Sequence, residues 1–383
     1  MASVTQFDLL TCPDPQSVLD DVTDVWNVDS ALRPHASLTA SEVELVEQLA
    51  FHFGTAPESY EIAISDESFL ITPCKRGVVN VIVDGNIWHI PGGILAPPDL
   101  RPQIVEWLKH IAENHGKTLA VYSIGAEDVV AFRDSGYEVS RFGMEPFVDL
   151  KGLTWSGSRF QWVRRQANFC TRAGLVVREI VTSEEQRLLA SALLGIMHDD
   201  LSGRTYPKPL RLLEAVFDPT NLQQRRLFVA MKDDQIQAFV ACTPMHNGTE
   251  WAFETYRKAT DSVRGVVPFL FKTVMDSMQS EGVSRVSLCL VPGKKLNKRI
   301  PNDSVLVNRL LSLWYRRMNF LFNVQGLDHF KQRFRPEEQV RYVCVSPKST
   351  LRSAISFARV TGALRPNIAN LASALFRSAT HRN

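Results

Sequence analysis

The order of strand and helix patterns between residues 225 and 292 is the feature that most limits what this chain can fold into. The β-rich run RRLFVAMKDDQIQAFVACTPM is broken by Asp233-Asp234, a pattern typical of a hairpin. A strand (TEWAFETYRK), a helix (GVVPFLFKTVMDSMQSEG) and a further strand (SRVSLCLVP) follow it. This order predicts a mixed sheet with helices packed on its faces, which is an α/β arrangement.

The first half of the chain contains a degraded version of the same order. The pattern predicts a helix over Thr39–Phe53, a hairpin turning at Asp84-Gly85, a helix in LRPQIVEWLKHIAENHG and a strand in TLAVYSIG. The run YEVSRFGMEPFVDL is interpreted as a pair of strands, and VRYVCVSP as the last strand of the second half.

The order in the second half resembles that of GNAT-type acyltransferases. We therefore expect an α/β (α+β) protein with two GNAT-like domains in tandem, each a mixed twisted sheet flanked by helices. The predicted parts are an acidic lead-in (1–38), an N-terminal domain (39–150), a C-terminal catalytic domain (151–345) and a basic amphipathic tail (346–383).

Composition restricts the protein class. Apolar residues make up 45% and charged residues 22% of the 383 residues, which is typical of a globular protein and excludes a disordered chain. No window approaches the roughly 18 uninterrupted apolar residues of a membrane span, and the N-terminus has no secretory signal pattern. The six cysteines are too dispersed for a disulfide framework or a zinc site, so we expect reduced thiols and a cytoplasmic location.

Charge is distributed unevenly along the chain. Residues 1–50 carry nine acids and one base, whereas residues 284–383 carry eighteen Lys and Arg and four acids. The basic third favours a polyanionic partner, either nucleic acid or an anionic membrane surface. The alternative is a solvated basic face that balances the acidic N-terminus.

The tail from 346 to 383 contains no Asp or Glu. Leu351, Ile355 and Ala358 recur at helical spacing, and Gly362 and Pro366 divide the stretch into two expected helices. A basic amphipathic segment of this kind can lie at a lipid interface, which predicts a peripheral position on the inner face of the cell membrane. A helix pair docked on the second domain is the alternative.

Three segments hold candidate chemistry. The first is the strand that carries Glu254 and Arg257. If the strand bulges there, both side chains reach one cleft, where Glu254 could orient or deprotonate a nucleophile and Arg257 could hold an anion. The alternative is a structural ion pair.

The second segment is the strand-to-helix turn at Arg264-Gly265. A phosphate-binding turn at a helix N-terminus needs closely spaced glycines, but Val266, Val267 and Pro268 follow here. The missing spacing argues against an acyl-CoA donor and favours a larger polyanion, such as a charged tRNA.

The third segment is the run from Asn323 to Pro336. It places Lys331 among apolar anchors, where a lysine can stabilise an oxyanion, while its aromatic residues could stack on bases or pack inward. No serine–histidine–aspartate set is readable. His198 beside two aspartates is a weak metal candidate, so we expect no metal site.

Two stretches carry a resemblance to a known family. Residues 136–174 include Gly143-Met144-Glu145, Asp149-Leu150 and the helix with Arg164 and Asn168. Residues 325–342 include Gln325-Gly326-Leu327, Phe330-Lys331, Phe334-Arg335-Pro336 and Arg341-Tyr342. In order and spacing, they are similar to the motifs of phosphatidylglycerol lysyltransferase-type proteins over about residues 50–345.

The resemblance implies two tandem GNAT-like domains and the transfer of an aminoacyl group from aminoacyl-tRNA to a lipid hydroxyl, forming an ester. The acidic and arginine positions of that family's central strand fall on Glu254 and Arg257, and its lysine falls on Lys331. Glu254 stands where an aspartate is usual, and Pro268 replaces another aspartate.

The hypothesis is therefore an aminoacyl-tRNA-dependent aminoacyltransferase that needs no cofactor beyond the charged tRNA as co-substrate. Glu254, Arg257 and Lys331 are its expected catalytic residues. Expected substrate-binding residues are Tyr256, Arg264, Gln325, Arg333, Arg341 and Tyr342. Expected tRNA-binding residues are Arg159, Arg164, Arg165, Arg172, Lys294, Lys295, Lys298 and Arg299. The alternatives are a soluble small-molecule acceptor, a CoA-dependent N-acyltransferase, or a binding protein without activity.

Overall fold

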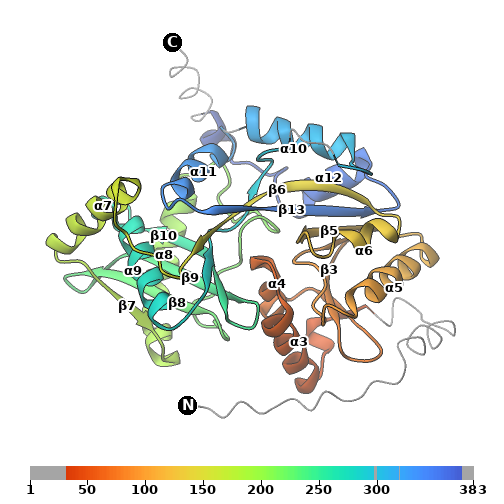
Figure 1. The fold of residues 1–383 in the computed structure, drawn as a ribbon, viewed down its shortest axis with the longest axis horizontal. Coiled ribbons are helices and arrows are strands. Elements are labelled where there is room, and N and C mark those ends of the chain that lie inside the picture. The colour runs from red at the N-terminus through yellow and green to blue at the C-terminus, as the bar shows by residue number, and fades with distance from the viewer. Residues whose placement is uncertain (1–31, 297–299, 319, 373–383) are drawn as a thin grey trace.

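A computed structural model describes residues 32–296, 300–318 and 320–372. Its strands form one thirteen-stranded mixed sheet that runs the length of the molecule, with helices on both faces (Figure 1). The strand order is β1-β2-β3-β4-β5-β13-β6-β11-β10-β9-β8-β7, and β12 pairs with β6 outside this path. The predicted α/β class is confirmed. Among the described residues, no helix combines the length and apolar character needed to cross a membrane.

The N-terminal half supplies one end of the sheet. Its strands are β1 (Arg33–Pro34), β2 (Ser68–Ile71), β3 (Val78–Asp84), β4 (Ile87–Ile90), β5 (Thr118–Ile124) and β6 (Glu138–Asp149). Its helices are η1 (His35–Ser37), α3 (Ala40–Phe53), α4 (Pro57–Glu61), η2 (Ile62–Ile64), α5 (Arg101–Asn114) and α6 (Val129–Asp134).

Two local predictions in this half are confirmed. Thr39 caps α3 in a reciprocal capping box with Glu42, which satisfies backbone N–H groups that would otherwise lack partners. The predicted β3–β4 hairpin is present, with Gly85 and Asn86 as its two turn residues, because Asp84 pairs with Ile87.

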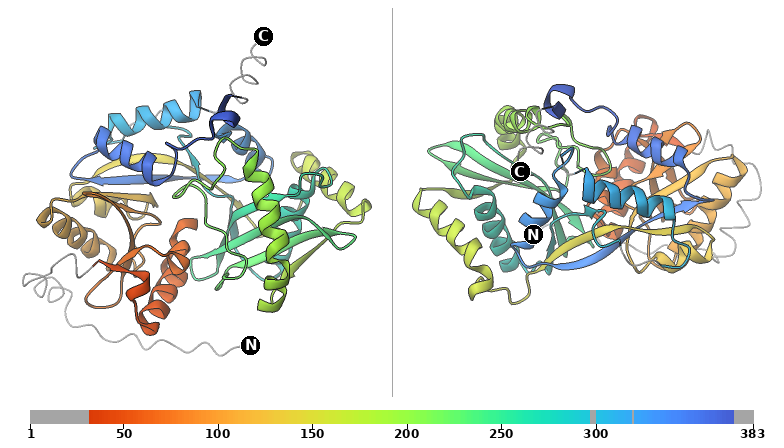
Figure 2. Two further views of the ribbon diagram at one scale, coloured as in Figure 1. Left: turned by 180° about the vertical axis from the view of Figure 1, so that it is seen from behind. Right: turned by 90° about the horizontal axis from the view of Figure 1, so that it is seen from above.

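The C-terminal half supplies the other end. Its strands are β7 (Val176–Ile180), β8 (Arg226–Lys232), β9 (Gln235–Met245), β10 (Glu250–Lys258), β11 (Arg285–Ser287), β12 (Val291–Pro292) and β13 (Glu337–Ser346). Its helices are η3 (Ser158–Phe160), α7 (Gln161–Arg172), α8 (Ser183–Ser202), α9 (Val266–Ser280), α10 (Val305–Arg317), α11 (Val324–Gln332) and α12 (Leu351–Val360). Figure 2 shows α8 and α9 on opposite faces of this part of the sheet.

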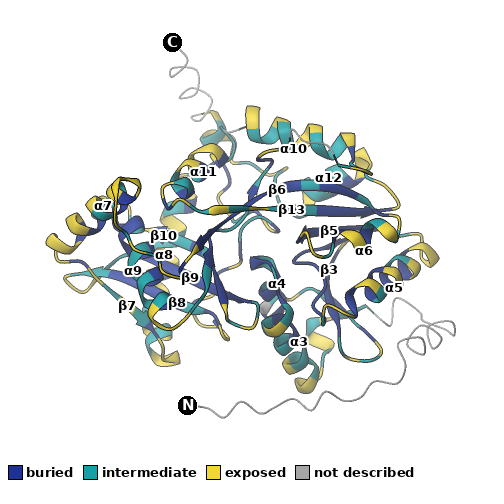
Figure 3. Ribbon diagram, in the orientation of Figure 1, coloured by how far each residue is buried: buried dark blue, intermediate teal, exposed yellow. Residues whose placement is uncertain are grey.

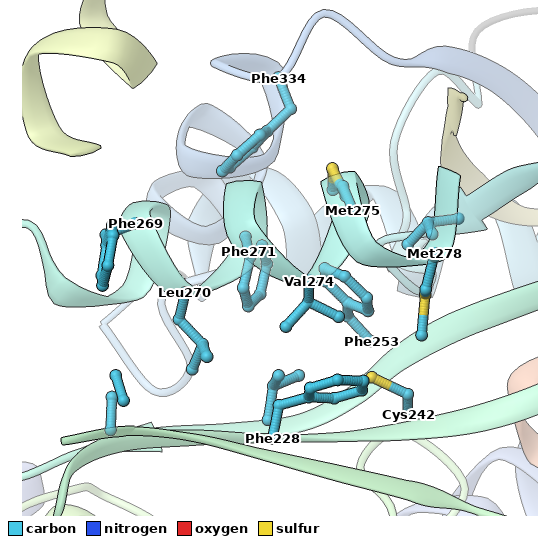
Figure 4. Close-up of a cluster of buried hydrophobic side chains, with 14 of the residues drawn as sticks. Phe228, Cys242, Phe253, Phe269, Leu270, Phe271, Val274, Met275, Met278 and Phe334 are labelled. Atoms are coloured by element: carbon cyan, nitrogen blue, oxygen red, sulfur yellow. The ribbon is translucent and has the colours of Figure 1, made fainter. Parts of the chain in front are cut away.

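The core of the C-terminal half lies between α9 and strands β8 to β11. Phe271, Val274 and Met278 of α9 are buried against Phe228 and Phe253, and Phe334 covers the helix from its other side (Figure 4). The burial pattern in Figure 3 follows this division, because the sheet interior is buried and the outer faces of the helices are exposed.

Two sequence interpretations are wrong. The segment interpreted as a strand pair is a single strand, β6, which pairs with β13 along its length and with β11 near its end. The expected last strand of the second half, β13, inserts between β5 and β6 and so completes the sheet of the first half. The domain boundaries 38/39, 150/151 and 345/346 stay predictions, but the two halves share strands across them.

A buried ion pair secures this insertion. Arg341 of β13 donates to Glu145 of β6, with side-chain exposures of 5% and 1%. Glu145 also accepts from Ser287 of β11, and Arg341 donates to the carbonyl of Thr55, 2.6 Å away, just before α4. The ion pair therefore connects β13, β6, β11 and the segment before α4.

Arg341→Ala should lower the free energy of unfolding by about 3–5 kcal/mol, because it leaves Glu145 buried and uncompensated. Urea denaturation followed by circular dichroism measures the change. Arg333→Ala, at an exposed position, is the matched control and should cost less than about 1 kcal/mol. Equal stabilities for the two variants would contradict a structural role for the pair.

Candidate functional site

The candidate site lies beside a β-bulge in β10 and next to the point where the pairing of β10 with β11 ends. The register of β10 against β9 shifts between Phe253 and Thr255, so Glu254 is the extra residue of a β-bulge. Strand β10 pairs with β11 only over Glu250–Ala252, because β11 ends at Ser287. The resulting pocket has a volume of about 910 Å³, with lining residues that include Glu254, Cys289 and Leu290. The condition stated for the sequence hypothesis, a bulge at this point of the strand, is therefore met.

The three expected catalytic side chains all line this pocket. Glu254 and Arg257 project from β10, and Lys331 projects from α11. The site thus joins the central strand to a helix 74 residues further along the chain, as the sequence hypothesis requires. Their catalytic roles stay predictions.

Glu254 has hydrogen-bond partners on β9 and just before β8, and it also lies beside the Glu61 carboxyl group of α4. Its Oε2 atom accepts from Thr243 and lies 3.4 Å from Arg225 Nη1, while Oε1 has no hydrogen-bond partner among the described residues. The side chain is 4% exposed. Oε1 is therefore a buried acceptor in a pocket wall, a position that favours binding of a proton donor or cation.

Arg257 is fixed by carboxylates. Its Nε lies 3.0 Å from Asp200, and Nη2 donates to Glu214 at 3.1 Å. Asp200 follows His198, the weak metal candidate, and no group of His, Cys, Asp or Glu in the described ranges has an arrangement that could hold a metal ion. Arg257 therefore forms structural ion pairs and also lines the pocket. Its carboxylate partners orient the guanidinium group in the pocket wall.

Lys331 is buried, at 3% exposure, and donates to the carbonyl oxygens of Cys289 at 2.8 Å and Leu290 at 3.3 Å. Burial lowers the pKa of this ammonium to about 8. An ammonium has three N–H donors, so one stays available for a ligand oxygen after these two bonds.

The N-terminal half contributes two carboxyl groups that the sequence interpretation missed. Glu58 and Glu61 of α4 line the same pocket. Burial raises the pKa of Glu58 to about 7, and the Glu145 carboxylate adds to the rise. Burial, with a further contribution from Glu254, raises the pKa of Glu61 well above its ordinary value. No spacing rule could identify them, because α4 reaches β10 only through tertiary packing.

Of the expected substrate-binding residues, only Tyr256 and Gln325 line the pocket. Arg341 is committed to Glu145, and Tyr342 packs against the core of the N-terminal half. Arg333 is exposed and lies over the Trp162 ring, with 5.5 Å between its guanidinium carbon and the ring centroid. Arg264 is exposed on the turn before α9. The structure brings none of these four to the pocket.

The turn at Gly265 is covered by α7. A Cβ atom at Gly265 would lie 2.4 Å from Oε1 of Gln166, and the Cys170 thiol lies 3.6 Å from the Arg264 carbonyl oxygen. A side chain of α7 thus packs against Gly265, so a larger residue would not fit at this position without a shift of Gln166.

The expected tRNA-binding residues divide into groups. Arg159, Arg165 and Arg172 are exposed on or beside α7, and Arg164 donates to the carbonyl of Gly157. Lys294 is an exception, because its ammonium is buried between Asp328 and Glu338 and does not face solvent. Lys295 is 60% exposed but also pairs with Glu338. Lys298 and Arg299 lie outside the described residues.

Comparisons with known proteins place these features in a family. The family described as "Phosphatidylglycerol lysyltransferase, C-terminal" matches residues 49–345. Phosphatidylglycerol lysyltransferase of Bacillus subtilis is 22% identical over 254 residues, covering 65% of this chain and 29% of the relative. The lysylphosphatidylglycerol biosynthesis bifunctional protein LysX of Nocardia farcinica is 23% identical over 229 residues, covering 58% of this chain and 20% of the relative. The chain thus spans less than a third of the length of these relatives.

Solved structures confirm the fold. The C-terminal domain of a putative lysylphosphatidylglycerol synthetase from Agrobacterium fabrum superposes with a TM-score of 0.71 at 18% identity, covering 86% of this chain and 99% of that one. L-PGS from Bacillus licheniformis gives a TM-score of 0.68 at 20% identity, covering 85% and 97%. With the family match over most of its length, this chain belongs to the phosphatidylglycerol lysyltransferase C-terminal family.

Proposed function

We propose that this protein transfers an aminoacyl group from aminoacyl-tRNA to a hydroxyl of a membrane lipid of the phosphatidylglycerol type, forming an ester. The observation that carries the proposal is the convergence of Glu254, Arg257 and Lys331 on one pocket in a member of this family. A soluble acceptor is the second candidate, because the pocket also admits a small molecule.

The reaction needs positioning more than activation, because an aminoacyl-tRNA ester is already reactive. The acceptor oxygen attacks the ester carbonyl carbon, the bond to the ribose oxygen breaks, and the acceptor proton ends on that ribose oxygen. The free N–H of Lys331 would bind the carbonyl oxygen as it becomes an oxyanion. Glu254 Oε1 would receive the acceptor proton or hold the α-ammonium of the aminoacyl group.

A charged tRNA fits the donor role better than acyl-CoA for two reasons. The turn before α9 lacks the closely spaced glycines of a pyrophosphate cradle, because Val266, Val267 and Pro268 follow Gly265. The exposed arginines of α7 supply an extended basic surface suited to an RNA backbone. No further cofactor enters the proposal. The protein would work at the inner face of the membrane and contact it peripherally.

Lys331→Met should lower kcat at least 100-fold, because it removes an oxyanion donor. The wild-type rate should be full below pH 8 and fall as the pH rises through about 8, since the buried ammonium then loses its proton. Lys331→Arg is the control, because a guanidinium stays charged in this range, so its residual activity should lack the alkaline fall.

The measurement is initial transfer of radiolabelled aminoacyl groups to phosphatidylglycerol, corrected for spontaneous hydrolysis of the donor. A wild-type rate that stays level to pH 10, or full activity in Lys331→Met, would remove Lys331 from the reaction.

Arg165→Ala and Arg172→Ala should each weaken tRNA binding and reduce the slope of log affinity against log salt by about 0.7–0.9, the value for one lost phosphate contact. Filter binding over a salt series measures this slope. Arg187→Ala, exposed on α8, is the matched control and should leave it unchanged. Salt-independent binding of the wild-type protein would reject a phosphate-dominated interface.

A further inference from the structure

Exposed apolar side chains gather on one part of the surface. Among the described residues, fifteen large apolar side chains are exposed, and seven of these lie between residues 305 and 368. The seven, which define the α10–α12 face, are Val305, Leu310, Leu313, Leu351, Ile355, Leu364 and Ile368. Exposed aliphatic side chains at this density mark an interaction surface.

Helices α10 and α12 carry five of the seven side chains, and Leu364 and Ile368 lie in the segment after α12. Val307 and Leu311 of α10 and Phe357 of α12 pack on one sheet face, against a cluster that includes Phe142 and Val343. Figures 1 and 2 show the two helices side by side over this face. Residues on the opposite sides of both helices therefore point away from the sheet together, and Leu313 is 50% and Leu351 63% exposed.

The same face continues to the wall of the pocket. The segment after α12 is tied to residues 203–206, which line the pocket, by three hydrogen bonds. These bonds are Tyr206 Oη to the Ala363 carbonyl (3.1 Å), the Asn367 N–H to the Thr205 carbonyl (2.8 Å) and Asn370 Nδ2 to the Arg204 carbonyl (2.7 Å). Ile368 lies between the last two anchors and is 81% exposed.

The C-terminal end of α10 borders the pocket as well. Trp314, Arg316 and Arg317 line it, and Phe320, Leu321 and Phe322 follow in the same wall. The α10–α12 face thus continues into the pocket wall at the C-terminal end of α10.

The charged side chains that α10 and residues 347–372 contribute to this face are all basic. Neither α10 nor the stretch 347–372 contains an acidic residue. Exposed cations accompany the apolar side chains: Arg309, Arg316, Arg317, Lys348, Arg352 and Arg365. Aliphatic groups with flanking arginines match an anionic bilayer, whose acyl region takes the former and whose phosphates take the latter. An RNA backbone would match the arginines but not seven aliphatic side chains.

We propose that the α10–α12 face lies on an anionic phospholipid bilayer and presents the pocket opening to the lipid headgroups. The inference rests on the proposed function and gives the acceptor a route: a headgroup enters the pocket while its acyl chains stay in the membrane. The sequence predicted lipid binding by residues 346–383 alone. The proposed surface adds α10, which precedes that segment. One side of α12 is docked, through the Phe357 ring and a Ser356–Asp84 hydrogen bond at 2.6 Å, so its other side is the lipid side.

Leu310→Ser/Leu313→Ser/Ile355→Ser in the full chain tests the face. Cosedimentation with vesicles of phosphatidylglycerol and phosphatidylcholine should fall at least tenfold, since interfacial binding scales with buried apolar area. Transfer to vesicle phosphatidylglycerol should fall with it. Transfer to water-soluble dihexanoyl-phosphatidylglycerol should stay within about twofold of wild type, because none of the three residues lines the pocket.

Val176→Ser/Val181→Ser/Leu188→Ser is the matched control, with three exposed apolar residues on β7, the loop after it and α8, and should bind vesicles as wild type does. Arg309→Glu should weaken vesicle binding and Arg187→Glu should not. Normal vesicle binding by the Leu310/Leu313/Ile355 variant would overturn the proposal. So would a loss of self-association or of RNA affinity, rather than vesicle binding, in that variant.

Two further outcomes separate this inference from the proposed function. A wild-type protein that transfers to the dihexanoyl lipid but does not bind vesicles would overturn the docking face and leave the transferase proposal standing. A wild-type protein whose vesicle binding depends on the face, but which transfers to neither lipid, would support the docking face and contradict the transferase proposal.

Discussion

The placement of β13 between β5 and β6 is the constraint on which the pocket depends. The Glu145–Arg341 ion pair lies at this junction and reaches the Thr55 carbonyl at the start of α4. Helix α4 carries Glu58 and Glu61 into the pocket wall, where Glu61 lies beside Glu254 of the bulge. Because the pair is buried, each charge requires the other, so the last strand, the first half and the pocket form one cooperative unit. A cut at the predicted domain boundary would divide the site.

Local sequence signals predicted the parts of the structure that short-range physics determines. The capping box at Thr39 and the hairpin after Asp84 each depend on residues within a few positions of one another. The signals could not place β13, since a short apolar run is compatible with either neighbouring sheet. They also missed Glu58, Glu61 and the carboxylates that orient Arg257, because those contacts join segments about 40 to 200 residues apart.

Charge alone was a poor guide to location. Lys294 and Arg341 count among the bases of the C-terminal third, yet both are buried and paired with carboxylates. Burial of an unpaired charge is costly, and two of the four acids of that third, Asp328 and Glu338, neutralise the buried Lys294. The bases left at the surface then have few acidic neighbours there. The basic character of the α10–α12 face is partly a consequence of this internal pairing.

The positions of the basic surfaces follow from the shape of the sheet. Helix α7 packs on α9 at one end of the molecule, whereas α10 and α12 cover the sheet face near its middle (Figure 1). A polyanion and a bilayer compete for arginines if they share a surface, because both bind guanidinium groups through phosphate. Aliphatic side chains distinguish the two ligands, because their burial in a lipid interface is favourable and an RNA backbone offers no apolar surface to bury them. The apolar component of the α10–α12 face, more than its charge, therefore distinguishes the proposed bilayer surface from the proposed RNA surface on α7.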